Sequence, residues 1–136
     1  MKTPPKQQAK LTEEVLDHYI NWFEIPALNF KRAVDFYKSI FQIEMETNTM
    51  NGYSMAFFPT ENGIGGAVIS GEGTEPSEKG PLLYLNGGKN LDAILDRVEP
   101  SGGRVLMQKQ TINEDAGCFA LFIDSEGNKL ALHSRS

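Results

Sequence analysis

Residues 29–41 decide the fold, and they read NFKRAVDFYKSIF. Asn29 is a good helix N-cap, because its side-chain oxygen can accept a hydrogen bond from a backbone N–H of the first turn. The apolar side chains that follow recur at helical spacing, so they form one stripe that must be buried against a sheet. The stretch therefore predicts an amphipathic helix. Its apolar stripe comprises Phe30, Ala33, Val34, Tyr37, Ile40 and Phe41.

The same arrangement returns later in the chain. Asn90 is a second N-cap, 90 − 29 = 61 residues after the first. Pro100 and the Gly102-Gly103 pair end this second helix. Its apolar stripe consists of Leu91, Ile94, Leu95 and Val98.

Short segments typical of β-strands surround both helices. Turn residues such as Asn51-Gly52 separate them, and Pro26 requires the first strand to end there or to lie at a sheet edge. Each helix is preceded by one strand and followed by three. The expected strands are 20–25, 43–49, 53–59 and 66–70 in the first half, and 82–85, 104–109, 118–123 and 129–133 in the second.

The repeat predicts an α+β fold of two tandem βαβββ modules that form a curved mixed sheet around a cleft. We expect one domain over 20–135, with modules at about 20–70 and 81–135 and a linker at 71–80. Residues 1–19 form an N-terminal extension, with a short helix expected within 11–19 and capped by Thr12. Neither half is large enough to bury its helix stripe alone, so the two must share a core. The cleft between them is the expected ligand site.

Composition narrows the possible functions. The 136 residues fit one domain, and 13 basic against 18 acidic residues give a net charge of −5. That charge argues against nucleic acid and against an anionic membrane surface as partners. The single cysteine, Cys118, excludes an internal disulfide, and no apolar run is long enough to cross a membrane. We therefore expect a cytoplasmic protein.

Several segments together resemble one superfamily. They read WFEIP at 22–26, the helix at 29–41, GPLLYL at 80–85 and FALFIDSEGNKLAL at 119–132. In order and spacing they resemble the vicinal oxygen chelate superfamily, which includes glyoxalase I, bleomycin-resistance proteins, extradiol dioxygenases and fosfomycin-resistance enzymes. The resemblance implies the paired-module fold, a homodimer, and a divalent metal held by His and Glu on four strands. It is weaker for activity, because this fold carries many chemistries.

The resemblance also places the metal positions, and this sequence lacks the ligands there. They fall at Trp22, near Leu83, within 65–69 (GGAVI) and at Ala131, four residues after Gly127. Trp, Leu and Ala cannot coordinate a metal. We therefore expect no cofactor, with a divalent metal as the alternative.

Glu24 is the sharpest functional candidate and the best candidate for a catalytic residue. It shares a strand face with Trp22. A carboxylate among apolar neighbours would lose solvation, and its pKa would rise unless a cation or donor compensated. Glu24 could then serve as a general base, as an anchor for a cationic ligand, or as the partner of Arg104 or Lys109 in a structural ion pair.

Other side chains could line the cleft. Phe57, Met107 and Phe119 could supply apolar walls alongside Trp22, although aromatic residues on strands also serve simply as core. His133 shares the face of Ala131 and could contact a ligand, or it could be a partly exposed residue near the C-terminus. Cys118 is interpreted as a buried, inert thiol, and His18 as a surface residue.

Three functions are compatible with this pattern. The first is a metal-free binder of small molecules, similar to the bleomycin-resistance branch. The second is a metal-dependent lyase, isomerase or dioxygenase of the glyoxalase type, with ligands drawn from Glu24, His133 and either Glu61 or Glu126. The third is a partner or regulatory module whose cleft is filled by its own side chains.

Overall fold

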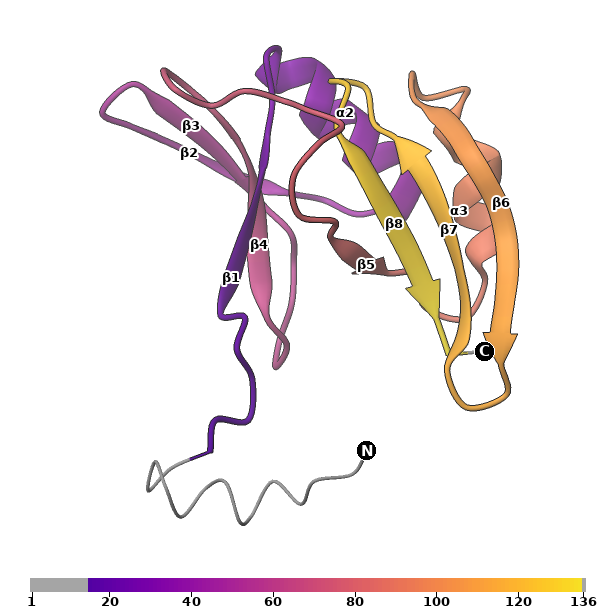
Figure 1. The fold of residues 1–136 in the computed structure, drawn as a ribbon. Helices are drawn as coiled ribbons and strands as arrows, with labels where there is room; N and C mark the ends of the chain where they lie inside the picture. The colour runs from indigo at the N-terminus through magenta and orange to yellow at the C-terminus, as the bar shows by residue number, and fades with distance from the viewer. Residues whose placement is uncertain (1–14, 136) are drawn as a thin grey trace.

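The computed structural model describes residues 15–135, and within them it shows two consecutive βαβββ modules (Figure 1). The first comprises β1 (Trp22–Pro26), α2 (Phe30–Phe41), β2 (Glu46–Met50), β3 (Tyr53–Phe57) and β4 (Gly65–Ser70). The second comprises β5 (Tyr84–Asn86), α3 (Leu91–Val98), β6 (Arg104–Asn113), β7 (Gly117–Ile123) and β8 (Lys129–Ser134). The predicted order of elements is confirmed.

Each module forms its own four-stranded mixed sheet. The strand orders are β1-β4-β3-β2 and β5-β8-β7-β6, so the two sheets have the same topology. The first strand of each module pairs in parallel with the last, and the remaining pairs are antiparallel. Pro26 is the last residue of β1, and β1 is an edge strand, as its missing N–H predicts.

Both predicted helix caps are present. The Asn29 side chain accepts from the Arg32 backbone N–H at 3.0 Å, and the Asn90 side chain accepts from the Ala93 N–H at 3.1 Å. These bonds satisfy donors that have no partner within the helix. The caps therefore fix where the two apolar stripes begin.

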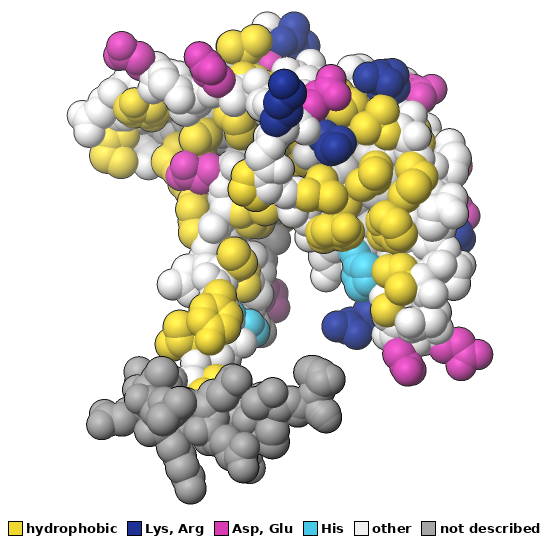
Figure 2. Space-filling model, viewed as in Figure 1, with side chains coloured by type: hydrophobic (Ala, Val, Ile, Leu, Met, Phe, Trp, Pro, Cys, Tyr) yellow, Lys and Arg dark blue, Asp and Glu magenta, His cyan; other side chains and the backbone are white. Residues whose placement is uncertain are grey.

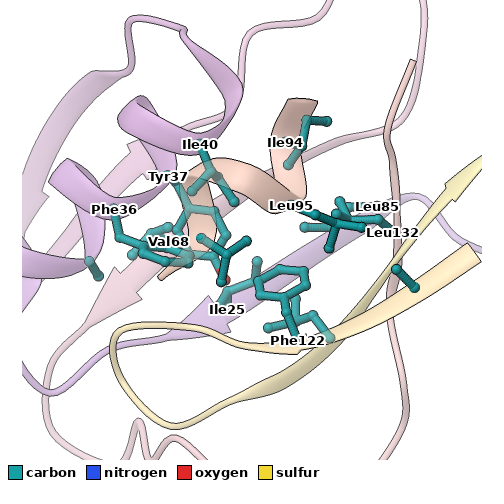
Figure 3. Packing of buried hydrophobic residues seen from close by; sticks show 14 of the residues in the cluster. Ile25, Phe36, Tyr37, Ile40, Val68, Leu85, Ile94, Leu95, Phe122 and Leu132 are labelled. Carbon is teal, nitrogen blue, oxygen red and sulfur yellow. The ribbon is translucent and has the colours of Figure 1, made fainter. Parts of the chain in front are cut away.

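The helix stripes and the sheets share one hydrophobic core. Figure 3 shows side chains of α2, α3 and both sheets pointing toward one another. Phe36 of α2 stacks on Phe122 of β7, with ring centroids 6.2 Å apart, and so packs across the module boundary. The two modules therefore share one core, as predicted.

A buried polar junction also ties the modules together, centred on the turn between β7 and β8. The Tyr37 hydroxyl donates to Asp124 Oδ2 at 2.6 Å. Asn128 Nδ2 donates to that same carboxylate at 3.0 Å and to the Pro26 carbonyl at 2.8 Å. Burial and the neighbouring Asp124 charge raise the pKa of the Tyr37 phenol well above its usual value, so it stays a donor.

Glu126 forms the second part of the junction. Its carboxylate accepts from the Leu28 and Asn29 backbone N–H groups at 3.0 and 2.8 Å, and from Arg32 Nε at 2.7 Å. Burial raises the pKa of Glu126, but the bonds from Arg32, the Asn29 N–H and Ser125 outweigh it and hold the pKa at about 2. The turn of the second module thus holds the β1–α2 connection of the first.

The structure corrects several details of the expected elements. The first strand begins at Trp22 rather than at residue 20, and the strand expected at 82–85 is Tyr84–Asn86. Residues 15–19, the described part of the predicted N-terminal helix, are not helical; residues 11–14 lie outside the described range. The predicted strand 43–49 begins at Glu46, because the C-terminal turn of α2 continues to Ile43, whose N–H donates to the Lys38 carbonyl at 3.2 Å. β6 runs four residues beyond the predicted 109, to Asn113.

Within residues 15–135, neither helix has the length and apolar character required to cross a membrane.

Candidate functional site

The faces of the sheets that point away from the helices form a concave surface. Alternation along β1 sends Ile25 into the core and leaves Trp22 and Glu24 on the opposite, exposed face. Along β8, Leu130 and Leu132 enter the core in the same way. Figure 2 shows a hollow between two limbs of the molecule, with apolar side chains gathered on the inner side of one limb.

Trp22, Glu24 and Phe57 form one cluster on the first sheet. Trp22 Nε1 donates to Glu24 Oε2 at 3.2 Å, and the Trp22 and Phe57 rings are tilted with centroids 6.1 Å apart. Gly65 lies beneath the indole, since a Cβ there would come within 3.2 Å of Trp22 Cζ3. Trp22 remains 44% exposed, so the cluster presents an indole face and a carboxylate to solvent.

The environment of Glu24 differs from the expectation. It is exposed rather than enclosed by apolar neighbours, because the concave face is open in this chain. An ion pair with Arg104 or Lys109, one of the three roles open to Glu24, is absent from the described residues. Lys109 pairs with Asp92 of α3 at 3.0 Å, and Arg104 takes part in none of the ion pairs there. Lys109 lies on the helix side of its sheet, which separates it from Glu24.

A groove of about 610 Å³ occupies the open face of the first sheet. Its lining mixes thioether, aromatic, aliphatic, amide and carboxylate groups. Glu24 is the single predicted site residue among them. The lining residues are Glu24, Asn48, Met50, Asn51, Tyr53, Met55, Ile69, Glu72, Gly73 and Thr74.

One wall of the groove comes from the linker after β4. Thr74 folds it into a turn, with its hydroxyl donating to the Gly71 carbonyl at 2.7 Å and accepting from the Gly71 N–H at 3.0 Å. The Tyr53 hydroxyl donates to the Glu72 carbonyl at 2.8 Å, and Gly73 has a φ of +89° that favours glycine. The linker is therefore a structured wall rather than a plain connection. Its Gly-x-Gly-Thr sequence was the signal for this turn.

The remaining candidates lie on the second sheet. Phe119 packs against Tyr84 with ring centroids 6.3 Å apart, and the register places Phe119 opposite His133. Met107 is opposite Leu121 across a bulged β6–β7 ladder. The six predicted residues thus divide between the two sheets, with Trp22, Glu24 and Phe57 on the first.

His133 has a defined tautomer. Its Nε2 lies 2.6 Å from the Ala116 carbonyl oxygen, and a carbonyl can only accept, so Nε2 carries the proton. In the neutral imidazole the other nitrogen, Nδ1, is then the acceptor. His18 is exposed and Cys118 is buried, as predicted.

The hydrogen-bond register locates equivalent positions in the two modules. The Ala27 N–H donates to the Ile69 carbonyl at 2.8 Å, and the Gly87 N–H donates to the His133 carbonyl at 2.7 Å. Ala27 lies two residues before its helix cap, whereas Gly87 lies three before its own. This extra residue turns the Leu83 side chain toward the core. The side chain that pairs with Ala131 on the other face is therefore that of Tyr84, one residue after the predicted position.

The side chains at the equivalent positions do not fit a divalent metal. Glu24 and Ala67 pair in the first module as Tyr84 and Ala131 pair in the second. The position expected at Trp22 therefore falls at Glu24 instead. One carboxylate, one phenol and two methyl groups lack the three or four ligands that such an ion needs.

The alternative ligands do not supply the missing donors. Glu126 is committed to the junction with Arg32, away from the concave face. Throughout residues 15–135, no three His, Cys, Asp or Glu side chains gather where they could hold an ion.

Comparison with known sequences agrees with this architecture. The family model described as Glyoxalase/Bleomycin resistance protein/Dioxygenase superfamily matches residues 19–132. The "Putative glyoxylase CFP32" of Mycobacterium bovis is 30% identical over 118 residues, covering 82% of this chain and 44% of that protein. The chain thus spans less than half the length of this relative.

Solved structures share the fold at low sequence identity. A glyoxylase/bleomycin resistance protein/dioxygenase domain from Frankia sp. EAN1pec has a TM-score of 0.67 at 14% identity, covering 89% of this chain and 93% of its own. The antibiotic-binding protein TnmS3 from Streptomyces sp. CB03234 has a TM-score of 0.62 at 20% identity, with coverages of 90% and 100%. The fosfomycin resistance protein FosX from Listeria monocytogenes has a TM-score of 0.63 at 13% identity, with coverages of 89% and 94%.

Proposed function

We propose, since the chain belongs to the Glyoxalase/Bleomycin resistance protein/Dioxygenase superfamily, that it binds an organic small molecule in the concave cleft without a metal ion. One observation carries this proposal. The matching positions on the four inner strands hold Glu24, Ala67, Tyr84 and Ala131, which together cannot chelate a divalent ion. The cleft keeps its shape and apolar walls, and those suffice for binding.

The concave surface has the properties of a ligand site. Trp22 offers an exposed indole face beside Phe57, and the adjoining groove of about 610 Å³ has the size of a drug-sized ligand site. Tyr84 and Phe119 supply a second aromatic wall on the other sheet. TnmS3, which shares the fold, is an antibiotic-binding protein. A ligand with flat, apolar parts would fit both walls.

A thermal-shift screen with and without a chelator tests this proposal. A panel of aromatic small molecules should include members that raise the melting temperature equally in both conditions. Trp22 is the only tryptophan, so its fluorescence should change with the same compounds. If the response disappears with chelator, the metal-free proposal is wrong.

The glyoxalase-type enzyme is the second candidate, and the name of the mycobacterial relative favours it. This function would require a metal bound by residues outside the family positions. Elemental analysis of the purified protein decides between the two. A stoichiometric divalent metal would support the enzyme, and its absence together with chelator-resistant binding would support the binder.

The proposal includes a homodimer in the cytoplasm. Large apolar side chains are exposed just before β1, among them Tyr19 and Ile20 at 81% and 55%, and a second copy could cover them. The net charge of −5 speaks against a nucleic-acid partner. Light scattering after size exclusion would measure the mass, and a mass of about 15 kDa at micromolar concentration would contradict the dimer.

A further inference from the structure

We propose that the groove on the first sheet selects a ligand with one positive charge on an apolar body, and that the linker turn carrying Glu72 is a specificity-determining part of the site. This inference rests on the proposed function, because it names the class of ligand for the same concave surface. It assigns Glu24 and Glu72 to the charged end of the ligand. It assigns Met50, Met55 and Ile69 to the apolar body.

The charges of the groove are of one sign. Among the residues that the structure describes, Glu24 and Glu72 are the only carboxylates in its lining, which includes no Lys, Arg or His. Among residues 15–135, neither glutamate takes part in any of the ion pairs. Within the described residues, Glu24 accepts a hydrogen bond only from a neutral donor, the Trp22 Nε1–H at 3.2 Å. Both carboxylates are therefore left without a cationic partner in the described part of the chain, and a ligand can supply one.

The walls of the groove suit the rest of such a ligand. Met50 and Met55 are flexible and polarizable, so they adapt to an irregular apolar shape. The N–H edge of the Trp22 indole points at Glu24, and the exposed part of the ring lies beside the groove, where it can extend the apolar surface. An anionic ligand would meet two like charges and be rejected.

The linker turn holds Glu72 in place at the groove. Tyr53 donates to the Glu72 carbonyl, and Thr74 closes the turn onto Gly71. These bonds fix the backbone that carries the carboxylate, so less conformational entropy is lost when a ligand binds. Tyr53 is a positioning residue in this scheme, since it acts on the cation through Glu72.

Two probes of matched shape test the inference: (4-hydroxybenzyl)trimethylammonium and the neutral 4-neopentylphenol, which has carbon in place of the charged nitrogen. Their affinities are measured by calorimetry on the full chain, at low and high salt. The variants are Glu24→Gln, Glu72→Gln and the double variant. Glu44→Gln is the matched control, because Glu44 is an exposed glutamate in a depression beside α2, outside the groove.

Each groove variant should lower the affinity for the cationic probe about two- to five-fold, and the double variant should lower it about ten-fold, as expected for solvent-exposed charge pairs. The affinity of the neutral probe should stay within two-fold, and the control should leave both probes unchanged. High salt should lower the affinity for the cationic probe and leave that for the neutral probe unchanged. A Tyr53→Phe variant should reduce the preference for the cation while circular dichroism shows an intact fold.

The two failures are distinguishable. If both probes bind and the glutamine variants leave the cation unaffected, the charge selection is wrong and the binding function stands. If neither probe and no compound of the wider panel binds, the proposed function fails and this inference fails with it.

Discussion

Replacing Glu126 by Gln should destabilise the protein, because this carboxylate holds the junction between the modules. The Glu126 side chain is completely buried, and its carboxylate accepts from Arg32, from two backbone N–H groups and from Ser125. Gln can keep the bonds from the backbone, but its NH₂ group would face the Arg32 guanidinium. The charge-assisted contact with Arg32, whose own side chain is 53% exposed, would thus be replaced by a contact between two donors.

The magnitude follows from the pKa of Glu126. Folding lowers this pKa from 4.5 to about 2. A difference of one in pKa corresponds to about 1.4 kcal/mol between the ionised and the protonated state. The native state therefore gains about 3 kcal/mol at neutral pH from keeping this group ionised. Because some bonds survive in the amide, we expect Glu126→Gln to lower the free energy of unfolding by about 2 kcal/mol at pH 7.

The same shift gives the pH dependence. A carboxyl group with a lowered native pKa stabilises the fold above its unfolded pKa, and this contribution is lost as pH falls through the native value. Stability should therefore decrease between about pH 4.5 and pH 2, and less steeply in the variant. Urea unfolding followed by circular dichroism at several pH values measures both effects.

The exposed Glu61→Gln is the control, because it makes the same chemical change on the surface. Its free energy of unfolding should stay within about 0.5 kcal/mol of the parent. If Glu126→Gln costs no more than this control at pH 7, or keeps the full pH dependence of the parent, the reasoning about the junction is refuted.

Three further predictions use the same unfolding measurement. Tyr37→Phe should cost about 1–2 kcal/mol, because Asp124 loses a buried donor, and no loss would show that this bond is dispensable. Gly66→Ala should cost about 1–3 kcal/mol, since its Cβ would lie 2.4 Å from the Phe23 ring; an unchanged midpoint would mean that the ring moves freely. Trp22→Phe should stay within about 0.5 kcal/mol of the parent because the indole is 44% exposed, yet weaken aromatic ligands of the thermal-shift panel. Unchanged ligand binding would remove Trp22 from the site.

Much of the fold could be predicted because its signals are local. The caps at Asn29 and Asn90 and the stripes behind them fix both helices within a few residues, since capping and helical periodicity act over one or two turns. The repeat then implies the shared topology of the sheets. Strand ends were less accurate, as β6 shows, because pairing partners rather than local residues determine where a ladder stops.

The site was predictable only in part. Alternation correctly placed Trp22 and Glu24 on one exposed face, because side chains alternate with period two along any strand. The position expected at Leu83 failed, since one extra residue before the second helix reverses that alternation. The wall made by the linker at Glu72 was missed, because the turn residues indicate a turn but not the direction in which it folds over the neighbouring strands.

The sequence by itself determined the two helices, the order of the strands and the duplicated topology. These depend on residue type and on spacing within a single element. Only the tertiary structure decided that Glu126 joins the modules through Arg32, that Lys109 pairs with Asp92, and that Glu24 faces a groove closed by the linker. Such contacts join residues far apart in the chain, and their geometry exists only once the sheets and helices have packed.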